Sequence, residues 1–215
     1  MFEHLFPGER LSRFYRFLEG KEFENLSPFS KGTTSLIFRA KLREKEVIIK
    51  LARPDSPRRN LEREAKILRL LEGKDITPRF IEYGVFEGLE YIVREFAPGE
   101  PVLHADIEKW HLVEIVRKAA LLDALRIDHG QIQGGKHIIL GRDVWIIDFE
   151  KAGFRKPKNL TSALAMLFLN DNSISKRIRS KFGLDKEFMA AMRSVAAEYK
   201  RDGNAGRILS LLSGL

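Results

Sequence analysis

Apolar residues along the first half of the chain follow the spacing of strands. Two β-rich runs at 36–40 and 46–50 are separated by a short charged turn, and two further runs lie at 79–84 and 91–96. Runs of this length and composition, bounded by turn residues, are typical of strands that pair in hairpins. The pattern therefore predicts a small sheet built from two hairpins in this half of the chain.

A helix is expected between the two hairpins, from about Pro57 to Glu72. Ser56 can cap its first turn, a proline fits that turn, and Gly73 can end the helix. Its apolar residues form one stripe at helical spacing. Glu64 lies beside this stripe, so its carboxylate can face a neighbouring strand.

Three further segments complete the predicted domain organisation. Residues 1–28 are expected to form an N-terminal helical extension, because the apolar residues between positions 10 and 18 have helical spacing. A first lobe is predicted over residues 29–99, ending at the Pro98-Gly99 turn signal. Residues 100–215 would form the second lobe.

The second lobe is predicted to be helical around one small hairpin. Its strands are expected at 137–140 and 144–147, with a turn at 141–143. The order of elements predicts an α+β protein with an N-terminal sheet lobe and a C-terminal helical lobe. The expected helices cover residues 106–125, 160–169, 175–182, 185–199 and 205–212.

The composition narrows the class of protein. Hydrophobic residues make up 44% and charged residues 32% of the 215 positions, as in soluble globular proteins, and the absence of cysteine excludes disulfides and thiolate metal sites. No apolar run approaches the roughly 20 residues of a membrane span, and the start lacks a signal-peptide pattern. We therefore expect a cytoplasmic protein with no membrane partner. Abundant Lys, Arg and Glu with little Gln favour a thermophilic source.

The excess positive charge lies in the last 65 residues. Residues 151–215 contain 13 Lys and Arg against 5 Asp and Glu, whereas the remainder contains 25 of each sign. Basic runs occur at 154–158 and 175–181. Such asymmetry indicates a polyanionic partner that contacts one face, although a solvated surface would show the same pattern.

The stretch from Leu122 to Glu150 is the strongest candidate for chemistry. It places Asp148 at the end of an apolar strand, after a loop that contains His, Gln, Lys and Asp. A carboxylate in such surroundings can hold a metal ion and a phosphate, and the alternative is an aspartate that only caps the strand. A lysine at the end of another strand, Lys50 in EVIIK, is a second candidate, and as an alternative it is an ordinary surface lysine.

Together, EVIIK, the helical Glu64 and the DFE of 148–150 resemble the protein-kinase superfamily in its compact, Rio- and Bud32-like form, over about residues 25–155. The resemblance implies a kinase-like two-lobed fold that uses ATP and Mg²⁺. In that case Lys50 would bind the α- and β-phosphates, Glu64 would hold Lys50, and Asp148 would coordinate Mg²⁺. Glu150 stands where the family has glycine and would add a second carboxylate near the metal.

Further nucleotide contacts follow from the same resemblance. The loop SKGTTSLIF would cover the phosphates, although only Gly32 of the three family glycines is present, and Ser30 and Ser35 take the other two positions. The backbone of Glu95-Phe96-Ala97 would accept the adenine. The loop residues expected to contact the nucleotide are Ser30, Gly32, Thr33, Thr34, Ser35 and Ile37.

The predicted catalytic loop departs from the family pattern. Gln131 stands where the family has its catalytic aspartate, so Asp128 would act as the base or that role is vacant. His137 falls at the position of the metal-binding asparagine, and His129 resembles the structural histidine of the loop. Lys136 would meet the γ-phosphate, or it is a solvated loop lysine.

The combination HGQ…GGKHIIL…IDFEKA resembles more closely a set of small archaeal proteins described as predicted Ser/Thr kinases, which includes an archaeal RNA kinase. That likeness implies transfer of a phosphoryl group to a ribose 2′-hydroxyl of tRNA, with the basic C-terminal region holding the RNA. Two alternatives stay open, a protein Ser/Thr kinase and a nucleotide- or RNA-binding pseudokinase. Only about ten residues follow Asp148 before the next helix, too few for a peptide-docking platform. The basic residues expected to hold RNA include Lys176, Arg177, Arg179 and Lys181.

Overall fold

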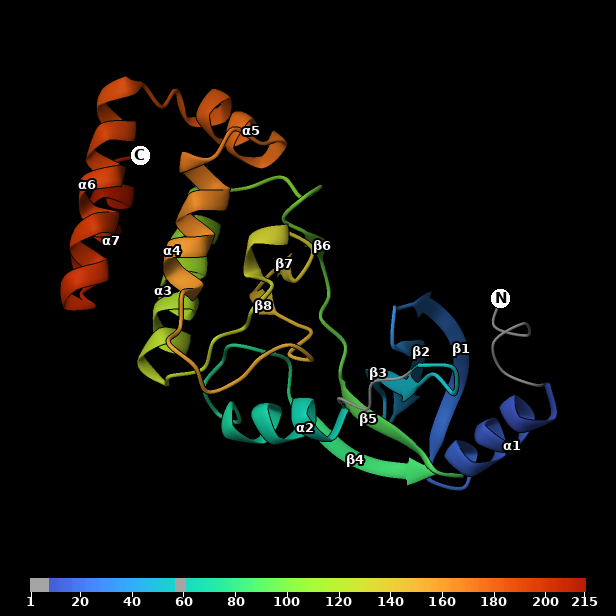
Figure 1. Cartoon of the computed structure of the whole chain (residues 1–215). Helices are drawn as coiled ribbons and strands as arrows, with labels where there is room; N and C mark the ends of the chain where they lie inside the picture. The colour runs from blue at the N-terminus through green and yellow to red at the C-terminus, as the bar shows by residue number, and fades with distance from the viewer. Residues whose placement is uncertain (1–7, 57–60) are drawn as a thin grey trace. The chain divides into compact units, whose positions relative to one another are not determined.

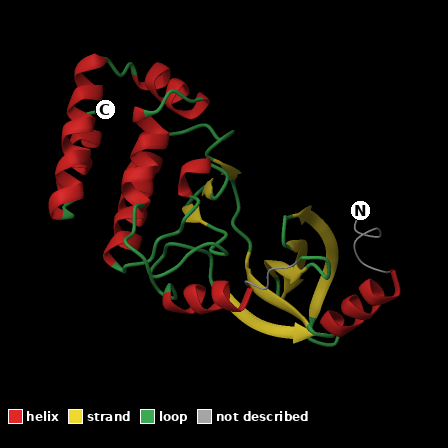
Figure 2. Cartoon of the chain, viewed as in Figure 1, coloured by secondary structure: helices red, strands yellow, loops and turns green. Residues whose placement is uncertain are grey.

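The computed structural model describes residues 8–56 and 61–215, which form two compact units. The first unit comprises Met1–Lys74 with Pro78–Ala97, and the second comprises Asp75–Thr77 with Pro98–Leu215. Figure 1 follows the chain from the sheet of the first unit to the helices of the second. The predicted α+β class, with an N-terminal sheet followed by helices, is confirmed (Figure 2).

The first unit is built on one five-stranded antiparallel sheet with the order β1-β2-β3-β5-β4. The two predicted hairpins are β2–β3 and β4–β5, and β3 pairs with β5 to join them. The edges of the sheet are therefore β1 and β4. The strands are β1 (Phe23–Lys31), β2 (Ser35–Leu42), β3 (Lys45–Ala52), β4 (Phe80–Phe86) and β5 (Leu89–Glu95).

The expected helical extension over residues 1–28 is wrong from Phe23 onward, where a strand begins. Helix α1 spans Gly8–Glu19, and the chain then enters β1, which belongs to the sheet. This strand escapes sequence patterns because only Phe23 is buried and because Pro28 interrupts it. A strand with a proline and one partner is tolerated at the edge of a sheet.

Helices α1 and α2 (Leu61–Leu70) pack on opposite faces of this sheet. Phe14 of α1 lies in a cluster with the buried residues Ile49 and Leu51 of β3, whereas Lys50 of the same strand contacts α2. Because successive side chains of a strand point to opposite faces, the two helices lie on different sides. The predicted start of α2 at Pro57 lies outside the described residues.

The second unit combines a three-stranded sheet with five α-helices among the described residues. Its sheet has the order β6-β7-β8, and Ile146 donates to the carbonyl of Ile76 at 2.9 Å, which ties the 75–77 segment to this unit. The elements are β6 (Glu100–Pro101), α3 (Lys109–Ala124), η1 (Ile132–Gly134), β7 (Ile138–Leu140), β8 (Val144–Ile146), α4 (Asn159–Leu164), η2 (Ala165–Leu169), α5 (Ser173–Phe182), α6 (Lys186–Asp202) and α7 (Gly206–Ser213).

The helix boundaries in the second unit have local causes. Asn172 and Asp185 cap α5 and α6 by accepting hydrogen bonds from backbone N–H groups, and Gly183 and Gly203 end these helices in the left-handed conformation. The helix predicted at 160–169 is α4 followed by a π-helical turn. Over residues 8–56 and 61–215, no helix is long and apolar enough to cross a membrane.

Candidate active site

Lys50 and Glu64 form a buried ion pair in the first unit. The Nζ atom of Lys50 lies 2.7 Å and 3.0 Å from the two carboxylate oxygens of Glu64, and the residues are 4% and 0% exposed. Strand β3 presents Lys50 to the face that α2 covers, so the pair links sheet and helix. Buried charges persist only when they are paired. The arrangement fixes one ammonium group in a defined position.

The predicted phosphate loop is the tip of the β1–β2 hairpin. Gly32 donates to the carbonyl of Ser35 at 2.8 Å, and its own carbonyl accepts from the guanidinium of Arg53 at 3.2 Å. Arg53 also donates its backbone N–H to Thr34, and Asp55 holds its guanidinium. The backbone N–H groups of Thr33 and Thr34 donate to no carbonyl within the described part of the chain. These two N–H groups can therefore donate hydrogen bonds to an anion.

The other predicted loop residues differ in their burial. Ser30 pairs with Ile37 in the β1–β2 register and is exposed, whereas Ser35 is buried at the start of β2. The Ser35 carbonyl oxygen lies 3.2 Å from the position of a Cβ atom built on Gly32. A larger residue at position 32 would therefore need a small shift of the loop.

The expected adenine contact at Glu95 and Ala97 lies at the end of β5. The N–H of Glu95 donates to Arg79, and its carbonyl accepts from Arg94 at 2.9 Å. Ala97 is buried and is the last residue of the first unit. A carbonyl has a second lone pair, so Glu95 can still accept a hydrogen bond from a base.

Asp148 has a left-handed backbone conformation in the second unit. Its φ is +67°, which is uncommon for any residue other than glycine, and its carboxylate lies 3.4 Å from Nδ1 of His137. Strained backbone of this kind costs about 1–3 kcal/mol and clusters at functional sites. The structure thus brings together two residues of the predicted site, Asp148 and His137. The carboxylate is 29% exposed and can reach a ligand.

His129 is a buried neutral histidine that connects the loop to the strand before Asp148. Its Nε2 lies 2.9 Å from the carbonyl of Ile147, and its Nδ1 lies 3.3 Å from the N–H of Gln131. A carbonyl only accepts and an N–H only donates, so the proton is on Nε2. Burial lowers the pKa of His129 to about 4, which keeps the ring neutral. His129 thus fits a structural role.

Asn159 holds the backbone of the same loop from the first turn of α4. Its amide oxygen accepts from the N–H of His129 at 2.8 Å, and its Nδ2 donates to the carbonyl of Ile127 at 2.7 Å. Asp123 in turn accepts hydrogen bonds from Asn159 and from the hydroxyl of Tyr199 at 2.8 Å. Burial and this hydrogen bond raise the pKa of Tyr199. Helices α3, α4 and α6 therefore position the loop together.

Asp128, one of the candidates for a base, is held by its surroundings. Its carboxylate is paired with Arg155 and accepts from the N–H of Lys158 at 3.2 Å, and its backbone forms an antiparallel bridge with Gly153. The residue is 8% exposed. These contacts hold the carboxylate in one orientation and occupy one acceptor site on each of its oxygens. The structure therefore favours a positioning role for Asp128 over a role as the base.

The remaining predicted residues of the loop are closer to solvent. Gln131 is half-buried and its side chain is not tied by any hydrogen bond within the described residues. Lys136 is exposed, and Glu150 is half-buried two residues after Asp148. Gln131 and Lys136 therefore can contact a substrate.

The basic stretch of α5 is largely neutralised inside the second unit. Arg177 donates to the carbonyls of Val102, Leu103 and Ala105, and Lys181 contacts Asp106 and Glu108 at 2.7 Å. Lys176 and Arg179 both pair with Asp171. These contacts make α5 a weaker polyanion site than its sequence predicts.

A sequence model of the phosphotransferase enzyme family matches residues 25–134, which are 110 of the 215 residues. The chain belongs to the phosphotransferase enzyme family. The match includes the Lys50–Glu64 pair and the loop through Gln131, and it supports a kinase-type phosphotransferase. The chain is also 37% identical over 115 residues to the uncharacterized protein MJ1211 of Methanocaldococcus jannaschii. This alignment covers 50% of this chain and 98% of that protein.

Membership of the phosphotransferase family implies ATP and Mg²⁺, and the residues present fit them. In the described part of the chain no group of three or more acidic, His or Cys side chains could hold a metal. Mg²⁺ is usually bound by one or two carboxylates together with substrate phosphates, and it prefers oxygen ligands. Asp148 and Glu150 fit that donor set, whereas His137 fits better as a neighbour that orients Asp148.

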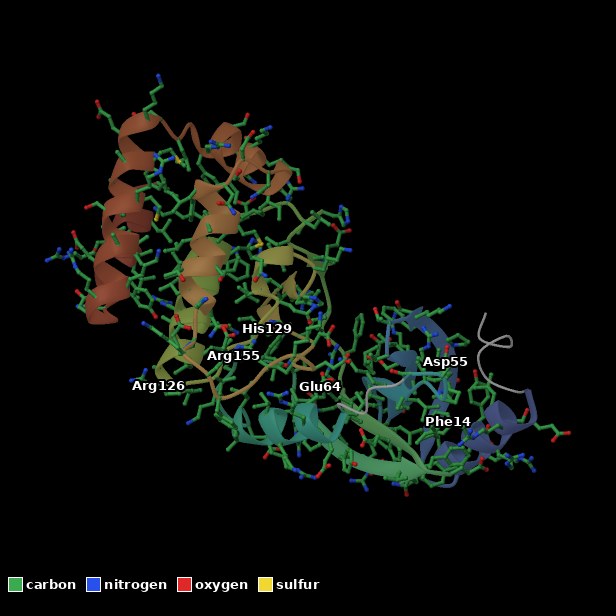
Figure 3. All side chains as sticks on the ribbon, in the orientation of Figure 1. Phe14, Asp55, Glu64, Arg126, His129 and Arg155 are labelled. Atoms are coloured by element: carbon green, nitrogen blue, oxygen red, sulfur yellow. The ribbon has the colours of Figure 1, made fainter. Side chains whose placement is uncertain are left out.

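Several residues of the family site have no local sequence signal. Asn159 and Arg155 contact a loop that lies about 30 positions earlier in the chain. Asp123 lies only a few positions before this loop and orients Asn159. Arg53, the residue that follows β3, holds the phosphate loop through the carbonyl of Gly32. Figure 3 labels His129 and Arg155 in the second unit and Glu64 in the first. Only the folded chain shows these partners.

Proposed function

We propose that the protein is an ATP- and Mg²⁺-dependent kinase that phosphorylates a hydroxyl of structured RNA, a ribose 2′-hydroxyl of tRNA. Lys50, held by Glu64, would bind the α- and β-phosphates, and the amides of Thr33 and Thr34 would contact phosphate oxygens. Asp148 would hold Mg²⁺, with Glu150 close by. When bound, the metal would neutralise the charge that develops on the phosphates.

The side chains of the loop would position the acceptor. The Gln131 side chain can accept a hydrogen bond from the incoming hydroxyl but cannot take its proton. The hydroxyl oxygen attacks the γ-phosphorus, the bond to the β-phosphate oxygen breaks, ADP leaves, and the proton passes to water or to a phosphate oxygen. A loose transition state makes little demand on a base. Lys136 is placed on the same exposed loop and would contact the γ-phosphate.

The observation that supports an RNA acceptor is the segment after Asp148. Ten residues, 149–158, separate Asp148 from α4, and four of the last eight are basic. Such a short segment leaves no room for an ordered peptide-docking platform. Its charge instead complements a phosphate backbone.

A binding module without turnover is the second candidate. It is favoured by Gln131 in place of an acidic residue and by the ion pair that holds Asp128. Such a module would still bind nucleotide through Lys50, and it would show no transfer to any acceptor.

Purified protein incubated with γ-labelled ATP, unfractionated tRNA and total cell protein distinguishes these functions. We expect label in tRNA that ribonuclease removes and protease does not. A 2′-phosphate blocks alkaline cleavage at its own nucleotide, so alkaline hydrolysis should release a labelled dinucleotide. Label in polypeptide would indicate a protein kinase, and nucleotide binding without labelling would indicate the binding module.

A further inference from the structure

The segment Lys151–Lys158, here the basic segment, combines positive charge with an exposed aromatic ring. Its sequence KAGFRKPK has four basic residues and no acidic ones. Phe154 is 69% exposed, the largest value among the exposed large hydrophobic residues described. Its ring makes no aromatic or cation–π contact within the described chain. The segment therefore presents an accessible aromatic ring next to positively charged side chains.

The basic segment is fixed beside the loop that carries Gln131. Gly153 and Asp128 exchange two backbone hydrogen bonds of 3.0 Å, and the Arg155 guanidinium pairs with the Asp128 carboxylate. Gly130 has φ +80°, and a Cβ atom there would collide with the Arg155 guanidinium. The positive φ favours glycine at position 130, and a Cβ atom there would also lie 3.1 Å from the carbonyl of Lys151. A molecule on the basic segment would lie next to Gln131.

A polar cavity of about 230 Å³ lies between these two segments. Gln133 of the loop lines it, together with Arg155, Lys158 and Ser162. Asp128 also lines the cavity but is neutralised by Arg155. Lys158, Gln133 and Ser162 supply hydrogen-bond donors for a phosphate oxygen in this cavity.

Three of the four positive charges of the basic segment have no carboxylate partner within the described residues. Lys151, Lys156 and Lys158 are exposed, and their ammonium groups form no ion pair within residues 8–56 and 61–215. In α5, by contrast, all four basic side chains have carboxylate or carbonyl partners. A polyanion would displace no ion pair of these three lysines.

We propose that the basic segment is the surface that binds the acceptor RNA, with phosphates on its lysines and one unpaired base stacked on Phe154. Basic side chains supply salt-dependent affinity for the backbone, and exposed aromatic rings stack on bases of any sequence. The assignment rests on the proposed function. This surface replaces α5 as the expected RNA-binding surface, and the bound RNA strand would lie beside Gln131.

The test measures binding of fluorescent unfractionated tRNA, without nucleotide, across a range of salt concentrations. One variant carries Lys151→Gln, Lys156→Gln and Lys158→Gln. The matched control carries Lys186→Gln, Arg193→Gln and Lys200→Gln on α6, which removes the same charge from exposed positions. The salt slope is the slope of log binding constant against log salt concentration. We expect its magnitude to fall by about two to three units in the first variant and to stay at the wild-type value in the control.

Phe154 is tested separately from charge. We expect Phe154→Leu to weaken binding roughly five- to 150-fold and to leave the salt slope unchanged, because a leucine cannot stack. Phe154→Trp should restore binding. Equal slopes for both triple variants, or wild-type binding by Phe154→Leu, would overturn the assignment.

The labelling assay on the same proteins separates this inference from the proposed function. If tRNA is labelled but the lysine variant binds it normally, the surface is wrong and the function stands. If tRNA is not labelled but the lysine variant loses binding, the surface stands and the transfer reaction is wrong. Circular dichroism melting of each variant checks that the fold is kept.

Discussion

The side-chain amide of Asn159 bridges the backbone on both sides of Asp128, with its Nδ2 2.7 Å from the carbonyl of Ile127 and its oxygen 2.8 Å from the nitrogen of His129. Asn159 is 1% exposed and receives its own orientation from Asp123. An amide supplies a donor and an acceptor at once, which neither a carboxylate nor an aliphatic side chain can do. One side chain from about 30 positions later in the chain therefore ties the backbone on both sides of Asp128.

Replacing Asn159 should loosen the loop and lower stability. We expect Asn159→Ala to lower the free energy of unfolding by about 2–4 kcal/mol, because it leaves a buried N–H and a buried carbonyl without partners. Urea unfolding measures this loss. Thr161→Ala, on the same helix at a partly exposed site, is the control and should cost less than about 1 kcal/mol. Equal losses in the two variants would contradict the role of Asn159.

Substitutions in the Lys50–Glu64 pair should affect the free energy of unfolding and nucleotide binding differently. Lys50→Met alone leaves a buried carboxylate without its partner and should cost about 3–5 kcal/mol of unfolding free energy. The double change Lys50→Met with Glu64→Leu should regain much of that stability, since no buried charge is left.

Nucleotide binding separates the functional role of this pair from the structural one. Titration with a fluorescent ATP analogue should show weak binding for both the single and the double variant. Lys45→Met breaks an exposed pair with Glu95 and serves as the control, with an effect below about 1 kcal/mol. Normal nucleotide binding by the double variant would show that Lys50 acts only in the fold.

Asp148 should be needed for transfer and not for folding. Asp148→Asn keeps a side chain that tolerates positive φ but removes the charge, so we expect phosphoryl transfer to fall roughly a hundredfold or more. The unfolding free energy should change by less than about 1 kcal/mol. Asp143→Asn, in the exposed turn of the β7–β8 hairpin, should leave both quantities unchanged. Wild-type transfer by Asp148→Asn would remove Asp148 from the metal site.

His129 should make stability depend on pH. Its pKa is lowered from an ordinary value of 6.5 to about 4, so the unfolded chain takes up a proton before the folded chain does. The contribution of neutral His129 to the free energy of unfolding is complete above pH 6.5. It declines as the pH falls towards 4 and does not change further below that pH. From pH 7 to pH 5 the wild type should lose about 2 kcal/mol more than His129→Gln. Parallel stability curves for the two proteins would show that His129 is not buried as a neutral ring.

Local pattern was sufficient for most elements of the fold. The β2–β3 and β4–β5 hairpins, α1 and the helices of the second unit follow from apolar spacing, turn residues and caps. The edge strand β1 and the short β6 could not be predicted, because their residues are mostly exposed and carry no periodic pattern. Pairing with a neighbouring strand, which is a long-range contact, decides those segments.

The sequence by itself determined the α+β class and the likeness to kinase-type phosphotransferases, and its short local motifs predicted which residues carry the chemistry. Tertiary structure alone decided how these residues are used. It buried Lys50 against Glu64, tied Asp128 to Arg155, and engaged the basic residues of α5 with carboxylates and carbonyls. Whether a charge is available for a ligand depends on its neighbours in space, and those neighbours are set by packing between distant segments.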